Sequence, residues 1–272
     1  SFSRRQRQMC IRDSNYYCLF WLLINTMIKS FGKYVLMLYY IFLKPEKLSV
    51  YWKRFLDEVI QLGVKSLFIV SLMSAFMGAV LVIQTATAIE SAWIPDYTVG
   101  FTVKQSMLLE FCPTIISLIL AGKVGSNIAS ELGTMKVTEQ IDALEVMGVN
   151  SIGFLIGPKI IASLFIFPIV IMYSIFFGFL GGGLVCYFTE IIPVKQYILG
   201  IRAFSEDNFI FIRYALTKTI VFAFLITSIS SYFGYYLKGG ALEVGKASTN
   251  AVVYSSIFIL FANYILTQLM LI

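Results

Sequence analysis

The chain has 272 residues, of which 58% are hydrophobic, 16% are aromatic and only 13% are charged, and its mean hydropathy is +0.82. This composition excludes an ordinary soluble domain and predicts a polytopic α-helical membrane protein, because several runs approach the ~20 apolar residues that cross a bilayer. The formal net charge of +6 does not indicate nucleic acid, since excess lysine and arginine in a membrane protein usually mark cytoplasmic flanks.

The available side-chain chemistry narrows the function classes further. Histidine is absent, which excludes histidine-based acid–base catalysis and histidine metal ligation. The four cysteines lack the paired spacing of a metal or redox site, and no G-x-S-x-G nucleophile motif occurs. Segment 240–247, G-A-L-E-V-G-K-A, imitates a P-loop but has Ala247 where that loop needs serine or threonine for magnesium. We therefore expect a non-catalytic membrane subunit, with any ATP hydrolysis in a partner chain.

Residues 1–14 differ in character from the rest of the chain. The run S-F-S-R-R-Q-R-Q-M-C-I-R-D-S resembles translated sequencing adapter, and we expect it to be a non-native scar. The alternative is a signal peptide with Arg4–Arg7 as its basic region, but no small-residue cleavage site follows its short apolar core. We expect residues 15–272 to form a single transmembrane domain.

The segment from about 16 to 43 is aromatic and apolar but is interrupted by lysines. Lys29 and Lys33 are four residues apart and share one helix face, which favours a helix lying in the membrane interface over a clean span. Pro45 ends this helix. Basic residues then outnumber acidic ones before the first span, which places the N-terminus in the cytoplasm.

Five later runs are long and apolar enough to span a bilayer. Loop 90–100 has no lysine or arginine, which fits the outer side, whereas the later loops do not confirm the orientation. Small residues at 74–78 and 181–183 predict close helix packing. The spans are expected at about 64–89, 102–124, 158–188, 214–237 and 252–272.

Three of the polar residues inside these spans are candidates for function. Glu110 is the most informative, because a carboxylate at mid-bilayer costs at least ~2.5 kcal/mol on insertion scales and should face a cavity or a partner. Lys218, about one turn into the fourth span, is its natural opposite charge, and Gln84 should also face protein or a cavity. The pair could form a polar patch at the base of a cavity, or could only fix the packing of two helices.

The stretch 131–148, E-L-G-T-M-K-V-T-E-Q-I-D-A-L-E-V-M-G, is charged although it lies between apolar runs. Apolar residues from Val137 to Leu144 recur at the spacing of one helix stripe, and charged residues occupy the other side. Gly133-Thr134 supplies a turn and a possible N-cap, and Gly148 is a natural C′ stop. We expect a short amphipathic cytoplasmic helix that binds a soluble partner; a charged loop on lipid is the alternative.

The run E-L-G-T-M-K-V-T-E-Q-I-D-A-L, preceded by L-A-G-K-V-G-S at 120–126, resembles the signature of the MlaE permeases. These are the membrane subunits of ABC-type lipid transporters that work with MCE-domain proteins, and the similarity extends over about 31–272. In that family this segment is the coupling helix that docks into a separate ATPase. The resemblance thus implies ATPase coupling for Glu131, Gly133, Thr134, Lys136, Glu139, Gln140 and Asp142.

The resemblance also implies an assembly. Its expected parts are a homodimer enclosing a central cavity for phospholipid, two ATPase copies that bind ATP and magnesium, and an MCE-domain lipid-binding ring over the outer face. The expected location is the bacterial inner membrane. We expect no cofactor in this chain itself and no nucleic-acid partner.

Substrate-binding candidates follow from the same resemblance. Glu110 and Lys218 match charged positions associated with substrate handling in similar permeases. Where a family example carries arginine directly before this glutamate, this chain has Leu109, which leaves Lys218 as the main cationic candidate. The positions that match the cavity lining of similar permeases are Leu81, Ala88, Ile89 and Phe111.

Other functions compete with the permease interpretation. A secondary transporter would use Glu110 as an ion-coupling carboxylate, but no inverted repeat is visible. A membrane enzyme acting on lipids lacks a nucleophile motif. A structural scaffold would leave the charged residues within the spans unexplained.

Overall fold

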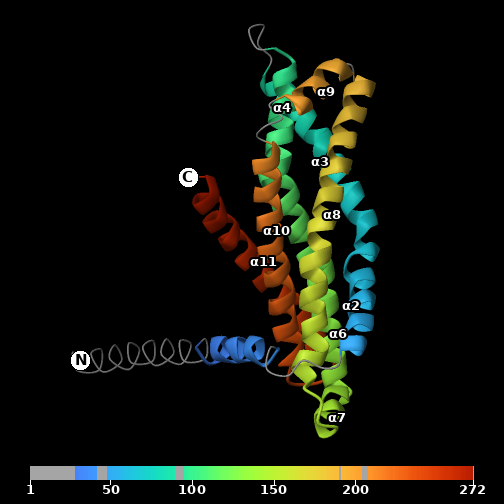
Figure 1. Cartoon of the computed structure of the whole chain (residues 1–272), viewed down its shortest axis with the longest axis vertical. Helices are drawn as coiled ribbons and strands as arrows, with labels where there is room; N and C mark the ends of the chain where they lie inside the picture. The colour runs from blue at the N-terminus through green and yellow to red at the C-terminus, as the bar shows by residue number, and fades with distance from the viewer. Residues whose placement is uncertain (1–27, 42–47, 90–94, 190, 204–207, 272) are drawn as a thin grey trace, which may run out of the picture.

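A computed structural model of the chain describes residues 28–41, 48–89, 95–189, 191–203 and 208–271 (Figure 1). Across these ranges the regular structure is entirely helical. The expected all-α polytopic fold is confirmed, because five of the described helices are long and apolar enough to cross a membrane. They are Tyr51–Ala88, Tyr97–Val137, Ser151–Thr189, Phe209–Tyr235 and Ala241–Met270.

The first spanning helix begins well before the predicted start at residue 64. It consists of α2 (Leu48–Leu62), a 3₁₀ turn η1 (Val64–Ser66) and α3 (Leu67–Ala88). The prediction excluded α2 because its charged residues lower the hydropathy. Two of these face the bundle: Glu58 pairs with Lys159, and the Arg54 guanidinium lies 3.8 Å from the centre of the Phe154 ring. A charged helix face can therefore extend an apolar span when a neighbouring helix supplies partners.

The second spanning helix is a 41-residue rod with two π-helical segments. Pro113 lies inside the first of these segments. Proline lacks a backbone N–H and its ring crowds the preceding turn, which the wider π-helix accommodates. Glu110 lies one turn before this proline, within the widened region. The rod consists of α4 (Tyr97–Ser106), η2 (Met107–Ile115), α5 (Ile116–Leu120), η3 (Ala121–Gly125) and α6 (Ser126–Val137).

The third spanning helix, α8 (Ser151–Thr189), packs closely against α3. Its 39 residues extend about 58 Å at 1.5 Å per residue, so it projects beyond a ~30 Å hydrocarbon core. A Cβ atom added to Gly78 would collide with the backbone of Gly178, and one on Gly181 would collide with Ala75. The two helices thus meet backbone to backbone at the predicted small residues.

A short helix, α9 (Val194–Arg202), caps the bundle at the end opposite α7 (Gln140–Val146) (Figure 1). Tyr197 fixes α9 in place: it is buried, and its hydroxyl donates a hydrogen bond to the Phe179 carbonyl at 3.3 Å. Burial raises the pKa of Tyr197 above its ordinary value, so the hydroxyl keeps its proton and remains a donor.

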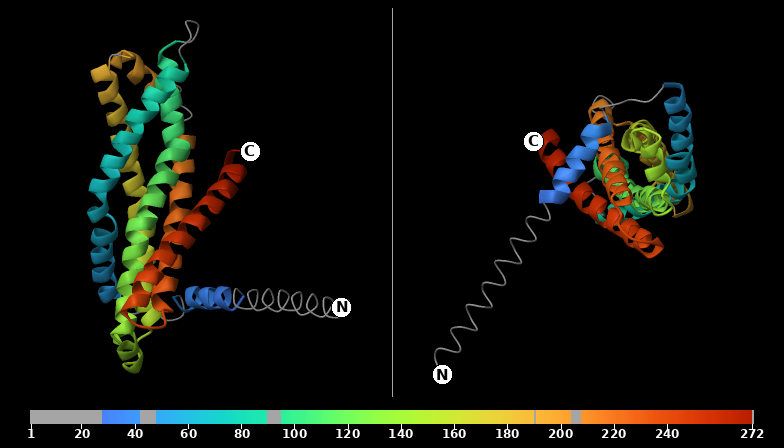
Figure 2. Two further views of the ribbon diagram at one scale, coloured as in Figure 1. Left: turned by 180° about the vertical axis from the view of Figure 1, so that it is seen from behind. Right: turned by 90° about the horizontal axis from the view of Figure 1, so that it is seen from below.

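The last two helices are α10 (Asn208–Tyr235) and α11 (Ala241–Leu271). They pack together near the α7 end, and α11 then diverges from the bundle toward the C-terminus (Figure 1, Figure 2). Only 11% of the most apolar window of α11 is buried, compared with 33% or more in each of the other four spans. Most of α11 therefore offers an apolar surface to lipid or to another protein.

Residues 28–41 form a helix that lies across the bundle axis near its α7 end (Figure 2). It is attached to α10 by Tyr34, whose hydroxyl is 2.8 Å from the Ser228 hydroxyl, and its Met37 side chain is buried in the hydrophobic core. Ile28, Phe31 and other large apolar side chains on this helix are exposed. This arrangement suits the interfacial helix expected at about 16–43, of which the part before residue 28 and the part after 41 lie outside the described residues.

Candidate functional site

A polar network surrounds Glu110 inside the second span. Lys218 Nζ on α10 lies 2.7 Å from Glu110 Oε1, and Asn263 Nδ2 on α11 donates to Glu110 Oε2 at 3.1 Å. Thr267 donates to Oε1 at 3.2 Å, and Thr114 donates to Oε2 at 3.3 Å. Both carboxylate oxygens are thus held by donors from three helices.

The two charges of this network differ in exposure. The Lys218 side chain is fully buried, donates a second hydrogen bond to the Leu109 carbonyl and lies over the Tyr214 ring, with Nζ 4.4 Å from the ring centre. The Glu110 side chain is 41% exposed. The carboxylate therefore lies at the surface of this single chain and the ammonium behind it. An ion pair without net charge costs less free energy within a membrane than a single charge does, and its exposed carboxylate can contact a polar group.

The sequence predicted the pairing of Glu110 with Lys218 correctly but missed four of their neighbours. Thr114, Tyr214, Asn263 and Thr267 complete the network, and Tyr214 donates to Thr267 at 3.1 Å. A signal for two of them was present, because Asn263 and Thr267 are polar, four residues apart and within an apolar run. The polar face of the last span therefore indicated that Asn263 and Thr267 belong to the network.

The proposed lining residues stand in different surroundings. Leu81 is buried in the hydrophobic core, and Phe111 and Ile89 pack against that core. Gln84 and Ala88 face outward from the single chain. Among the described residues, the hydrogen bonds to Glu110 come from its own helix, α10 and α11. The substrate-lining role of the α3 positions consequently stays a prediction.

The predicted helix over 131–148 is two helices. α6 continues to Val137, Glu139 adopts the left-handed conformation with φ of 59°, and α7 then covers Gln140–Val146. The predicted turn and N-cap at Gly133-Thr134 is wrong, because both residues lie inside α6 and the Thr134 hydroxyl donates to the Ser130 carbonyl at 2.8 Å. A Cβ on Gly133 would lie 3.3 Å from a Val244 methyl, so this glycine serves close packing against α11.

The predicted stop at Gly148 is confirmed. Gly148 has φ of +78°, and its N–H donates to the Glu145 carbonyl at 3.0 Å. The Val149 N–H donates to the Leu144 carbonyl at 3.1 Å. These two bonds form a Schellman motif, which satisfies the last carbonyls of α7 and turns the chain toward α8.

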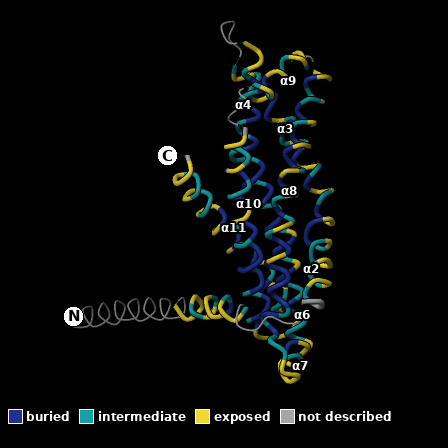
Figure 3. Tube along the Cα trace, in the orientation of Figure 1, coloured by how far each residue is buried: buried dark blue, intermediate teal, exposed yellow. Residues whose placement is uncertain are grey.

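α7 forms the extreme tip of the bundle (Figure 1, Figure 3). Val146 is 89% exposed and Met147 is 68% exposed, while Ile141 alone in this helix is buried. Glu139, Gln140 and Asp142 are exposed, and Lys136 pairs with Asp142 at 2.5 Å. An exposed apolar pair rimmed by acidic and amide groups is typical of a protein-binding surface. We call Glu139–Met147 the tip surface.

Glu131 does not belong to the tip surface. Its Oε2 lies 2.9 Å from Lys159 Nζ on α8 and accepts a hydrogen bond from Gln61 at 3.4 Å. Gly133 is buried against α11, as described above. The structure therefore divides the seven predicted coupling residues into two groups. Glu131 and Gly133 contact other helices of the bundle, and the remaining five lie at the outer surface of α6 and α7: Thr134, Lys136, Glu139, Gln140 and Asp142.

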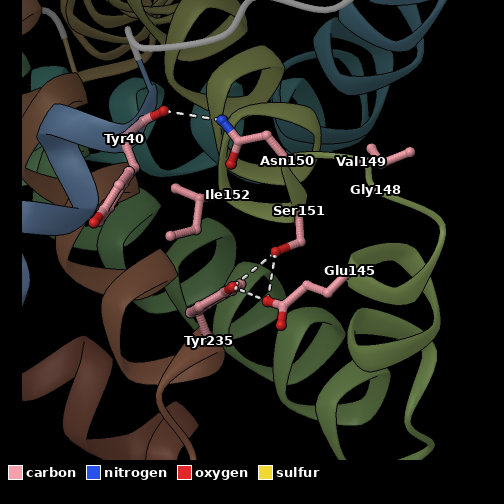
Figure 4. Close-up of a pocket in the computed structure, with 8 residues that line it drawn as sticks. All are labelled: Tyr40, Glu145, Gly148, Val149, Asn150, Ser151, Ile152 and Tyr235. Atoms are coloured by element: carbon pink, nitrogen blue, oxygen red, sulfur yellow. Dashed lines mark hydrogen bonds between the residues drawn. The ribbon is translucent and has the colours of Figure 1, made fainter.

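A cleft of about 390 Å³ lies beside the tip surface (Figure 4). The Glu145 carboxylate reaches into it and accepts hydrogen bonds from Ser151 and Tyr235, both at 2.9 Å. Asn150 Nδ2 donates to the Tyr40 carbonyl at 3.0 Å on the opposite wall. The Glu145 bonds attach α7 to α8 and α10, and the Asn150 bond attaches the connection between α7 and α8 to the helix over 28–41.

The segment that imitates a P-loop is not shaped to bind a nucleotide. Ala241 begins α11, and residues 241–247 are the first turns of this 31-residue helix. A P-loop wraps around phosphates as a loop before its helix starts. The similarity to a P-loop is therefore limited to the sequence pattern.

Comparison with known proteins agrees with this arrangement. Residues 55–269 match the family model described as "Permease MlaE". A "Probable ABC transporter permease protein" of Rickettsia bellii is 37% identical over 220 residues, which cover 81% of this chain and 84% of that protein. The "Intermembrane phospholipid transport system permease protein MlaE" of Haemophilus influenzae is 27% identical over 245 residues, covering 89% and 92%.

A plant relative extends the comparison. "Protein TRIGALACTOSYLDIACYLGLYCEROL 1, chloroplastic" of Arabidopsis thaliana is 31% identical over 220 residues, which cover 81% of this chain and 62% of that protein. The resemblance seen in the signature around residues 120–144 thus extends over most of the chain. The chain belongs to the MlaE permease family and is an ABC transporter permease.

Proposed function

We propose that the chain moves phospholipid between the bacterial inner membrane and an MCE-domain partner as the permease of an ABC-type complex. The observation that carries this proposal is the network around Glu110, in which a half-exposed carboxylate and a buried ammonium lie within an apolar bundle. A phospholipid has a charged headgroup and two apolar tails, so it needs a few polar groups among many apolar ones. The name of the Haemophilus influenzae relative, an intermembrane phospholipid transport system permease protein, supports the same substrate class.

Energy for transport comes from a separate ATPase subunit that binds the tip surface. The side chains of Val146 and Met147 are largely exposed, and a docking partner would remove them from water. ATP and magnesium are bound by that partner chain. The permease itself supplies the lipid pathway and the mechanical contact.

The working unit is a homodimer. The apolar face of α11 and the exposed side of Glu110 are surfaces that a second copy would cover, enclosing the two polar networks in one cavity. The α7 end faces the cytoplasm with the N-terminus, and an MCE-domain lipid-binding protein receives or delivers lipid at the α9 end.

Native mass spectrometry of the tagged chain, purified from its native membrane in mild detergent, tests this assembly. We expect two copies of the permease with two copies of a soluble P-loop ATPase. A folded permease recovered as a monomer without any ATPase under these conditions would contradict the proposal.

A further inference from the structure

Three charged residues from three helices meet at the α7 end of the bundle. Lys159 on α8 pairs with Glu58 on α2 at 2.5 Å and with Glu131 on α6 at 2.9 Å. Lys159 is 2% exposed and Glu58 is 14% exposed, whereas Glu131 is 35% exposed. The ammonium is thus enclosed, one partner is enclosed with it, and the other partner lies at the solvent edge.

Two carboxylates contact one enclosed ammonium. Lys159 pairs with both Glu58 and Glu131, and the half-buried Arg54 guanidinium on α2 also attracts both carboxylates without forming an ion pair with either among the described residues. The second oxygen of Glu58, Oε2, is buried and has no hydrogen-bond partner among the described residues. Glu58 therefore has unused capacity to accept a hydrogen bond, while Glu131 has an additional donor in Gln61.

Because Lys159 has two carboxylate partners, one of the two ion pairs is separable. Removing the only partner of a buried charge is strongly unfavourable, because the charge is left uncompensated in a medium of low dielectric constant. Here Glu131 can move away from Lys159 while Glu58 stays and neutralises it. The contact between α6 and α8 can thus break without stranding a buried charge.

The separable pair lies on the route from the tip surface to the spans. Glu131 is in the same helix, α6, that leads directly through Glu139 into α7. Lys159 is in α8, which packs along the length of α3 and also contacts α10. A displacement of α7 reaches the start of α8 directly through residues 147–150 and the Glu145–Ser151 hydrogen bond, and it reaches α8 again, about two turns further along, through α6 and this ion pair.

We propose that the Glu131–Lys159 pair is a releasable latch between the tip surface and the transmembrane helices, with Glu58 as the counter-ion that remains when the latch opens. The latch rests on the proposed function, since it passes on the movement of a docked ATPase. Glu58, Glu131 and Lys159 are positioning residues, and none of them touches lipid or nucleotide in this role.

The two carboxylates have opposite tasks, so their amide variants should fail in different ways. Glu131→Gln prevents the latch from forming, and we expect lipid moved per ATP hydrolysed to fall at least about fivefold, the lower end of typical coupling between sites. Glu58→Gln leaves the latch closed, because opening it would strand Lys159. There we expect ATP hydrolysis and lipid movement to slow together, also by about fivefold, with an unchanged ratio.

The measurement uses the complete complex in proteoliposomes, with ATP hydrolysis and transfer of labelled phospholipid followed in the same sample. Asp57→Asn is the matched control, because it removes one carboxylate from the exposed face of α2 next to Glu58. If Glu131→Gln yields too little folded complex, Glu131→Asp shortens the side chain and should lower the ratio in the same direction.

Two results would overturn the latch alone. A purely structural cluster would lower the yield and the melting temperature of both variants but leave the lipid-to-ATP ratio at the wild-type value. An equal fall of that ratio in Glu58→Gln and Glu131→Gln would remove the difference between the two carboxylates. A wild-type complex that moves no lipid with ATP would instead overturn the proposed function, and the latch with it.

Discussion

Replacing Lys218 with methionine is expected to abolish lipid transport and to destabilise the protein by about 3 kcal/mol. Glu110 would then keep only neutral donors, namely the Asn263 amide and the hydroxyls of Thr114, Tyr214 and Thr267, for a full negative charge within a span. The destabilisation is measured as a lower melting temperature in detergent. Melting is monitored by the loss of monodisperse protein on heating. Lys246→Met, which removes an exposed lysine from α11, should change neither property.

The double variant Glu110→Gln/Lys218→Met separates a functional pair from a packing pair. Replacing both members of a buried ion pair by neutral groups is often neutral or stabilising. We therefore expect the double variant to recover the wild-type melting temperature but to remain inactive in transport. Recovery of both properties would show that the pair only fixes the packing of α10 against the second span.

Replacing Asp142 with lysine is expected to reduce co-purification of the ATPase at least about tenfold while the permease stays folded. In the Lys136–Asp142 pair Asp142 is exposed and Lys136 is half-buried at the surface, so loss of the pair should cost less than about 1 kcal/mol of stability. The reversed charge, however, would face the partner across the tip surface. The ratio of ATPase to permease in the purified complex measures the effect.

Two controls make this prediction specific. Lys136→Glu/Asp142→Lys restores the ion pair within the chain but not the charge pattern offered to a partner, so we expect the ATPase to remain lost. Glu243→Lys reverses the charge of another exposed pair, on α11, and should leave binding unchanged. Rescue of ATPase binding by the swapped pair would mean that Asp142 acts only within the permease.

The sequence was sufficient for the membrane fold because apolar length decides it. Five runs near or above the length of a bilayer predicted the five spanning helices. The cost of a charge at membrane depth predicted that Glu110 would find a partner, and Lys218 is that partner. The glycine at 148 predicted a helix stop because few other residues adopt its left-handed conformation.

The remaining features depend on tertiary contacts, which hydropathy and periodicity do not encode. The break at Glu139 places a residue other than glycine in the left-handed region, and no turn signal in the sequence marks it. Glu131 fitted the charged side of a predicted amphipathic helix, but its actual neighbour, Lys159, is 28 residues away on α8. α2 was excluded from the first span because its buried Glu58 contributes to hydropathy as though it were exposed.

Transfer of labelled phospholipid in proteoliposomes that contain the permease and its ATPase tests the central claim most directly. The proposed function predicts that ATP moves lipid between the membrane and an MCE-domain acceptor, and that a proton gradient imposed without ATP moves none. Transport driven by the gradient alone, and lost in Glu110→Gln, would contradict it and identify Glu110 as the ion-coupling carboxylate of a secondary transporter.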